Sequence, residues 1–152
     1  MHRLAVGLTL LLAATAVSAE GAAAPENLGP KVDRLVEDTT KDAASESRAF
    51  DVLLKLGSEG VPYIISHLGD DRRLPEQSII IRRPGREDRQ VKPWYVHDGL
   101  EFVLTELTGF SMGPQNGHLL KAQREQNTRK WVAWCAGRFP EQADICRSGN
   151  RR

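Results

Sequence analysis

SRAFDVLLKLGSEGVPYIISHLG, residues 47–69, decides the fold class of this chain. Apolar side chains at helical spacing lie on both sides of Gly57: Phe50, Leu53 and Leu54 before it, and Val61, Ile64, Ile65 and Leu68 after it. We therefore expect one helix over about 41–56 and a second that carries Pro62 in its first turn and ends at Gly69. Helices joined by so few residues are expected to pack as an antiparallel hairpin. On the first helix, Glu46 is expected to face solvent.

Three further segments show the same spacing. Val32, Leu35 and Val36 predict a short helix after Pro30. The stripe from Val96 to Leu107 predicts a helix that ends at Gly109, and a last helix is expected over about 120–139. The second half of that helix carries Trp131, Trp134, Cys135 and Phe139 at helical spacing. This spacing favours packing in the core over a ligand site.

Between these helices the pattern changes. Ile79, Ile80 and Ile81 are consecutive β-branched residues followed by Arg-Arg-Pro-Gly, which predicts a short extended segment near 78–83. Residues 84–93 are polar without periodicity and are expected to form a loop. The sequence thus predicts a mainly α domain with one short extended segment.

The segment 47–74 resembles a HEAT-type helical repeat, with a helix ending in LxxLG, a valine-proline that opens a second helix, and L-x-D at its close. GLEFVLTELTGFSMG (99–113) followed by RKWVAWC (129–135) is similar to the tail of exported bacterial HEAT-like proteins. The resemblance covers about 41–139 apart from the arginine-rich loop. It implies HEAT-like antiparallel helical hairpins and an interaction scaffold rather than a catalyst.

The N-terminus has the pattern of a secretory signal peptide. Arg3 precedes an apolar run from Leu4 to Val17, and small residues lead to an expected cleavage after Ala19. A transmembrane anchor is the alternative, but the run is shorter than the roughly 20 residues that span a bilayer. We expect a signal peptide over 1–19, a disordered leader over 20–30, a helical domain over 31–140 and a C-terminal tail over 141–152. The product should be exported, periplasmic or secreted, without membrane insertion after cleavage.

Two cysteines, Cys135 and Cys146, suit a structural disulfide in an exported chain. Two unpaired thiols and a redox pair are the alternatives, although the C-x-x-C spacing of redox pairs is absent. Cys135 as a nucleophile with His97 or His118 as its base is a further alternative, and oxidation of the thiol counts against it.

The remaining patterns exclude several classes of function. The chain has 21 basic and 20 acidic residues, and removal of Arg3 with the signal makes the two equal, so no nucleic-acid partner is expected. No phosphate-binding or nucleophile-elbow motif is present, and no cofactor is expected. A metal site built from His97, Asp98 and Glu101 is an alternative to a helix start capped by Asp98.

The sequence therefore favours a protein-binding role over an enzymatic one. The expected activity is a non-enzymatic scaffold or adaptor of the cell envelope that binds a protein partner. The alternative is a periplasmic inhibitor or immunity protein against a cell-wall-targeting toxin, with the loop 82–92 as its inserting element. The candidate partner-binding residues surround the isoleucine run: Ile79, Ile80, Ile81, Arg82, Arg83, Arg86 and Arg89. The competing interpretation is that helices of the same domain cover the isoleucines.

Overall fold

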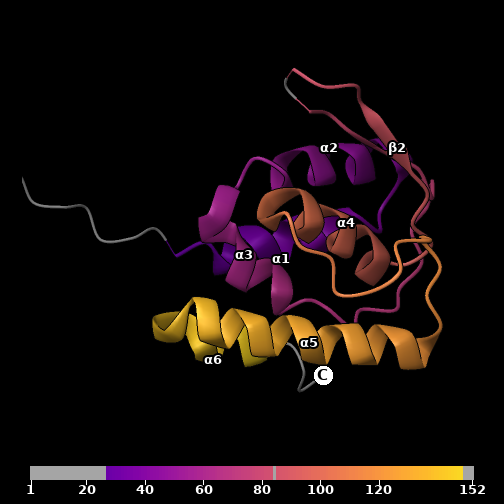
Figure 1. The fold of residues 1–152 in the computed structure, drawn as a ribbon. Coiled ribbons are helices and arrows are strands. Elements are labelled where there is room, and N and C mark those ends of the chain that lie inside the picture. Colours follow the sequence, from indigo (N-terminus) through magenta and orange to yellow (C-terminus); the bar gives the residue numbers. More distant parts are fainter. Residues whose placement is uncertain (1–26, 84, 149–152) are drawn as a thin grey trace, which may run out of the picture.

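The structure is a computed structural model that describes residues 27–83 and 85–148 (Figure 1). Within these residues the chain forms six α-helices and one antiparallel two-stranded sheet, so the mainly α class with a short extended segment is confirmed. The expected signal peptide over 1–19 and residues 20–26 of the expected leader lie outside the described part. None of the described helices is long and apolar enough to cross a membrane.

The first two helices are α1 (Gly29–Asp38) and α2 (Ala43–Leu53). Pro30 lies in the first turn of α1, where its missing N–H is not needed, and Leu28 just before the helix is buried. The folded domain thus begins inside the stretch expected to be a leader. In α2 the carboxylate of Asp42 caps the helix by accepting the N–H of Ser45 at 2.9 Å. The buried face of α2 is formed by Glu46, Ala49, Phe50 and Leu53.

The third helix, α3 (Gly57–Ile65), begins earlier than the sequence predicts. Pro62 lies inside the helix and not in its first turn, so the Ser58 carbonyl has no N–H at that position to accept. The expected hairpin between α2 and α3 also differs from the structure. Helix α2 packs mainly on α1, whereas α3 packs on α4 and also contacts α1, α5 and α6. The position of α3 between these four helices explains why Val61, Ile64 and Ile65 are all buried.

Strands β1 (Ile79–Ile81) and β2 (Arg89–Val91) form the antiparallel sheet. The first strand lies within the predicted extended segment. The second lies in the predicted loop over 84–93, and that loop prediction is wrong for 89–91. Polar residues hide β2 in the sequence because only Val91 of its three residues is apolar.

The two longest helices agree with the sequence. Helix α4 (Val96–Thr108) ends at Gly109, whose φ of 74° is the left-handed conformation expected of a helix-ending glycine. Helix α5 (Lys121–Arg138) places Trp131 and Cys135 in the core with no exposed surface. Trp134 lies at its edge, where its ring contacts those of Trp131, Phe110 and Phe139. The tryptophan-rich segment is therefore a packing face.

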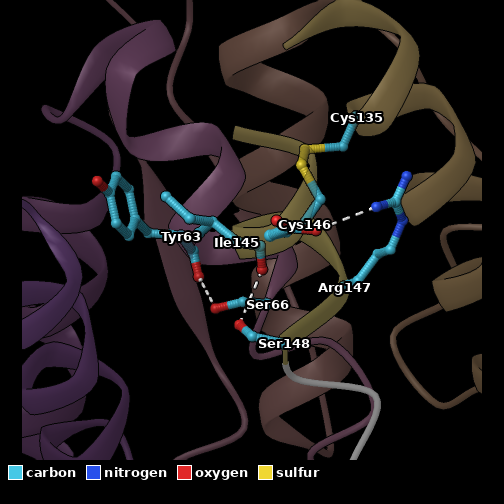
Figure 2. The surroundings of a disulfide bond; sticks show 8 residues. Tyr63, Ser66, Cys135, Ile145, Cys146, Arg147 and Ser148 are labelled. Carbon is cyan, nitrogen blue, oxygen red and sulfur yellow. Dashed lines mark hydrogen bonds and ion pairs between the residues drawn. A yellow bond between two sulfur atoms is a disulfide. The ribbon is translucent and has the colours of Figure 1, made fainter. Parts of the chain in front are cut away.

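The predicted C-terminal tail contains further structure. A 3-10 helix (Pro140–Gln142) leads into α6 (Ala143–Ser148), which contacts both α5 and α3. Figure 2 shows Cys146 of α6 bonded to Cys135 of α5, with Ile145 pointing toward α3 where Tyr63 lies. The predicted disulfide is present, with a Cα–Cα distance of 6.1 Å. It holds α6 against the helical body.

One hydrophobic core joins these elements. Its buried members come from all six α-helices, from both strands and from segments beside them: Leu28, Val32, Val36, Phe50, Leu53, Val61, Ile64, Ile65, Leu68, Leu74, Ile79, Ile81, Val91, Val96, Leu100, Phe102, Val103, Leu104, Trp131, Cys135 and Cys146. Residues from both ends of the described chain thus share one packed interior.

Candidate partner-binding site

The β1–β2 hairpin extends beyond α2 at the edge of the helical body (Figure 1). Its strands pair Ile79 with Val91, Ile80 with Gln90 and Ile81 with Arg89. Ile79 and Ile81 are 4% and 1% exposed, whereas Ile80 is 51% exposed, because successive strand residues point to opposite faces. Ile79 and Ile81 therefore anchor the hairpin in the core. This corrects their assignment as partner contacts, and of the three isoleucines only Ile80 remains a candidate.

The four candidate arginines of the hairpin differ in their surroundings. Arg82 is exposed and forms an ion pair of 2.7 Å with Asp51 of α2. The guanidinium of Arg83 donates to the Glu87 carbonyl at 2.9 Å, which ties the two sides of the hairpin tip together. Arg86 is exposed at that tip. Exposed Glu87 and Asp88 share the protruding part of the hairpin with these three arginines.

Arg89 is different because it faces the body. Its guanidinium lies 3.6 Å from the Glu106 carboxylate and over the ring of Phe102, both on α4. The side chain is 38% exposed and its contacts hold the base of the hairpin. Arg89 is thus a supporting residue rather than a free partner contact.

An aromatic and basic group that the sequence pattern does not reveal lies at the base of the hairpin. Trp94 is 41% exposed, and its ring lies 5.2 Å from the Arg73 guanidinium and 5.2 Å from the His118 ring. The backbone holds it on both sides, since Trp94 N–H donates to the Gly117 carbonyl at 2.6 Å and Leu74 N–H donates to the Trp94 carbonyl at 3.0 Å. The alternation of polar and apolar residues from Gln90 to Trp94 could have revealed this extended segment.

Gly117 makes the close approach to this segment feasible. A Cβ at this position would lie 2.2 Å from the Lys92 carbonyl oxygen, and the φ of 81° is strained for any other residue type. The loop between α4 and α5 is therefore held tightly against residues 92–94.

A buried polar group lies on α4 beneath this loop. His97 is fully buried, its Nδ1 accepts the Gly69 N–H at 3.0 Å, and its Nε2 has no hydrogen-bond partner among the described residues. Burial, with a smaller effect of the Arg124 charge, lowers the pKa of His97 to about 3. Asp98 accepts from the N–H groups of Tyr95 and Leu119, and burial raises its pKa to about 6. The histidine is neutral at pH 7 and has a structural role.

Glu101 completes this group one turn further along α4. Its carboxylate accepts from Trp131 Nε1 at 2.8 Å and from Asn127 Nδ2 at 3.0 Å, and burial raises its pKa. Because these donors occupy both oxygens, the carboxylate joins α4 to α5. Across residues 27–83 and 85–148, no group of three or more His, Cys, Asp or Glu side chains is placed to hold a metal ion.

A second buried carboxylate was expected at the surface. Glu46 of α2 is 0% exposed, and its Oε2 accepts the Glu76 N–H at 2.8 Å. Burial raises the pKa of this group. The prediction that Glu46 faces solvent is wrong, because its partner is a backbone N–H that lies thirty residues away in the sequence.

Neither Cys135 nor the groove beside α5 has features that favour a particular substrate or ligand. The disulfide leaves Cys135 without a thiolate, so it is not a nucleophile in this oxidised state. A groove of about 850 Å³ lies between the end of α3 and α5. Its lining carries both charge signs, and Arg72 within it is already bonded to Asp70 at 2.7 Å and Glu37 at 2.6 Å. The groove therefore shows no preference for one ligand charge.

Comparison of the chain with protein family models, with curated proteins and with solved structures finds no match. The candidate site accordingly rests on the geometry described above. It consists of the exposed part of the hairpin, namely Ile80, Arg82, Arg83 and Arg86, and the aromatic group at its base.

Proposed function

We propose that this protein is an exported, non-enzymatic module that binds a protein partner through the β1–β2 hairpin. One observation carries the proposal. Ile79, Ile81 and Val91 fix the hairpin in the core, while Ile80, Arg82 and Arg86 remain outward on the protruding part. A loop held rigidly on a helical scaffold loses little conformational entropy on binding, which favours recognition.

Export to an oxidising compartment is supported by two independent features. The N-terminal residues have the pattern of a cleaved signal, and the Cys135–Cys146 bond is of the kind that persists outside the cytoplasm. Intact-mass measurement of the protein purified from its native cells should give a chain that begins at Glu20. A chain that retains Arg3 would contradict this part of the proposal.

The absence of enzymatic activity is proposed from the use of the titratable side chains. The buried side chains with shifted pKa values, Glu46, His97, Asp98 and Glu101, are at most 3% exposed, and their hydrogen bonds lie within the domain. The resemblance of residues 47–74 to a HEAT-type repeat adds support, because that family implies an interaction scaffold. The role of a cell-envelope adaptor follows from this resemblance together with export.

The experiment is affinity capture from native envelope extract with two charge-reversed baits. The first carries Arg82→Glu and Arg86→Glu, which leaves the three anchoring side chains intact. The second carries Lys31→Glu and Arg129→Glu, the same charge change on exposed residues of α1 and α5. We expect the wild type and the second bait to retain a stoichiometric partner that the first bait loses. Equal capture by all three baits would exclude the hairpin as the contact element.

A second candidate function is inhibition of a cell-wall-degrading toxin. The protrusion of the hairpin beyond the helical body favours it, because such a loop can enter an active-site cleft (Figure 1). If the captured partner is such an enzyme, the wild-type protein should inhibit it and the Arg82→Glu, Arg86→Glu variant should not. Deletion of the gene should then make cells sensitive to their siblings, an outcome that an adaptor does not predict.

A further inference from the structure

The exposed surface of the hairpin continues beyond its strands. Burial alternates over 79–82 and over 90–94: Ile79 and Ile81 are buried while Ile80 and Arg82 are exposed, and Val91 and Pro93 are buried while Gln90, Lys92 and Trp94 are exposed. The bridge between Arg73 and Tyr95 pairs the two sides again below the sheet. We call residues 73–95 the arm; its outward face is formed by Ile80 and Arg82 of the first side and by Gln90, Lys92 and Trp94 of the second.

The outward face has a defined length and composition. Ile80 lies directly opposite Gln90, and extension of this register by two residues places Arg82 opposite Asp88. Trp94 is six positions further along the same strand, so Arg82 and Trp94 lie about 20 Å apart at the usual strand rise. Two exposed apolar side chains, Ile80 and Trp94, thus share one face with Arg82 and Lys92, and Asp88 lies opposite Arg82 at its upper end.

Trp94 is preorganised as an anchor at the lower end of this face. Its backbone is bonded to Gly117 and Leu74, and its ring lies against Arg73 and His118. An aromatic ring held in this way loses little freedom when a partner covers it. Trp and Arg are also the residue types most often found at the energetic centres of protein interfaces.

The charge of the arm selects the kind of partner. Residues 73–95 contain six basic and three acidic side chains, whereas the whole chain is nearly balanced with 21 and 20. Arg73 and Lys92 lie beside Trp94, and Arg82 lies beyond Ile80. A surface with this charge steers and orients acidic partners and disfavours basic ones.

We propose that the outward face of the arm, from Arg82 to Trp94, binds an acidic protein segment in extended conformation with Trp94 as its apolar anchor. The proposal rests on the proposed function, because it names the partner chemistry of the same hairpin and adds the arm's base to the contact surface. The segment carries carboxylates for Arg82, Lys92 and Arg73. Apolar side chains of the segment cover Ile80 and Trp94.

The test is selection from a phage-displayed library of random twelve-residue peptides on the immobilised, disulfide-bonded protein. We expect enrichment of peptides rich in Asp and Glu that also carry apolar residues. The best peptide, labelled with fluorescein, is then titrated with each variant in fluorescence anisotropy. Trp94→Ala and Lys92→Glu should each weaken its binding about tenfold or more, as expected for an anchor and a facing charge. Lys31→Glu on α1 should leave binding unchanged.

Each of the other outcomes contradicts a specific part of the proposal. In one outcome, peptide binding is abolished by Arg82→Glu with Arg86→Glu but unchanged in Trp94→Ala and Lys92→Glu. This result would retain the hairpin as the contact element and exclude the base of the arm. Enrichment of neutral or basic peptides, or of none, overturns the acidic segment as the partner. Vesicles that contain phosphatidylglycerol serve as the competing probe. Binding to these vesicles that Trp94→Ala abolishes, without binding of acidic peptides, would assign the face to an anionic membrane surface instead. Lys92→Glu changes an exposed side chain, so its result stands even if Trp94→Ala reduces folding.

Discussion

At the scale of single residues, His97 and Asp98 are neighbours on α4 whose buried side chains respond to acid in opposite ways. The pKa of His97 is about 3 in the folded protein, below its ordinary value, so the unfolded chain binds the proton more tightly. Stability from this group is therefore present at neutral pH and is lost as the pH falls below about 6.5. The pKa of Asp98 is raised to about 6, so its stabilising contribution is present in acid and is lost as the pH rises through about 6.

His97→Asn should make the protein more resistant to acid than the wild type. Asparagine places an uncharged acceptor near the position of Nδ1, so the Gly69 N–H keeps a partner while the group that must stay neutral is removed. The difference in unfolding free energy between the variant and the wild type should therefore be about 2 kcal/mol more in favour of the variant at pH 5 than at pH 7. Urea unfolding at both pH values measures this difference, and any constant cost of the substitution cancels.

Asp98→Asn is the matched variant and should change in the opposite direction. It removes a carboxyl group whose protonation stabilises the folded state. The unfolding free energy of the variant, compared with that of the wild type, should therefore be about 1 kcal/mol lower at pH 5 than at pH 7. His118→Asn, at an exposed histidine, serves as the control and should follow the wild type. Parallel pH profiles for all four proteins would contradict the buried, neutral state assigned to His97.

At the scale of the elements, alternate side chains of both strands hold the hairpin in the core, namely Ile79 and Ile81 of β1 and Val91 of β2. Ile81→Ala removes a side chain that is 1% exposed and leaves a cavity in the core, so it should cost about 2 to 4 kcal/mol of unfolding free energy. Ile80→Ala makes the same chemical change at a position that is 51% exposed and should stay within about 0.5 kcal/mol of the wild type. Urea unfolding at pH 7 compares the pair, and equal costs would contradict the strand register.

Helix α6 depends on the disulfide more than any other element does. Cys135 and Cys146 are 11 residues apart, and closing so short a loop stabilises the folded state by about 3 kcal/mol through the entropy of the unfolded chain. Reduction should lower the melting temperature and increase hydrogen exchange first in residues 140–148. The Cys135→Ser, Cys146→Ser variant should show the same pattern without reductant. Unchanged exchange in this segment after reduction would mean that packing on α3 alone holds α6.

Comparison of the predicted and observed elements shows which parts of the fold can be predicted from the sequence. Helices α4 and α5 were predicted nearly to their ends, because helical spacing and Gly109 are local signals. Strand β2 was missed because its pairing with β1 is a long-range property that its polar residues do not reveal. The helix pairing was also misjudged, since chain connectivity favours α2 against α3 whereas burial of their apolar faces selects α1 and α4.

At the scale of the whole molecule, the candidate site was only partly predictable. The exposed arginines of the hairpin follow from composition, but which isoleucine faces outward depends on the strand register. Trp94 was not singled out, because its exposure results from contacts with Leu74 and Gly117, which are distant in the sequence. The site thus forms where separate segments of the chain meet. The sequence predicts the hairpin segment but not the residues at its base that support it.

The single core predicts that the described domain unfolds as one cooperative unit. Val32 of α1, Val61 of α3 and Cys146 of α6 belong to one buried cluster with Trp131, so loss of any of these helices opens the interior of the others. In a Trp94→Phe variant, the remaining tryptophans Trp131 and Trp134 both report on α5 and its packing, while circular dichroism reports on all helices. Their urea transitions should coincide in midpoint and slope, with the disulfide intact. A fluorescence transition that precedes the loss of helix would show that α5 separates from an otherwise folded body, and would divide the molecule into two units.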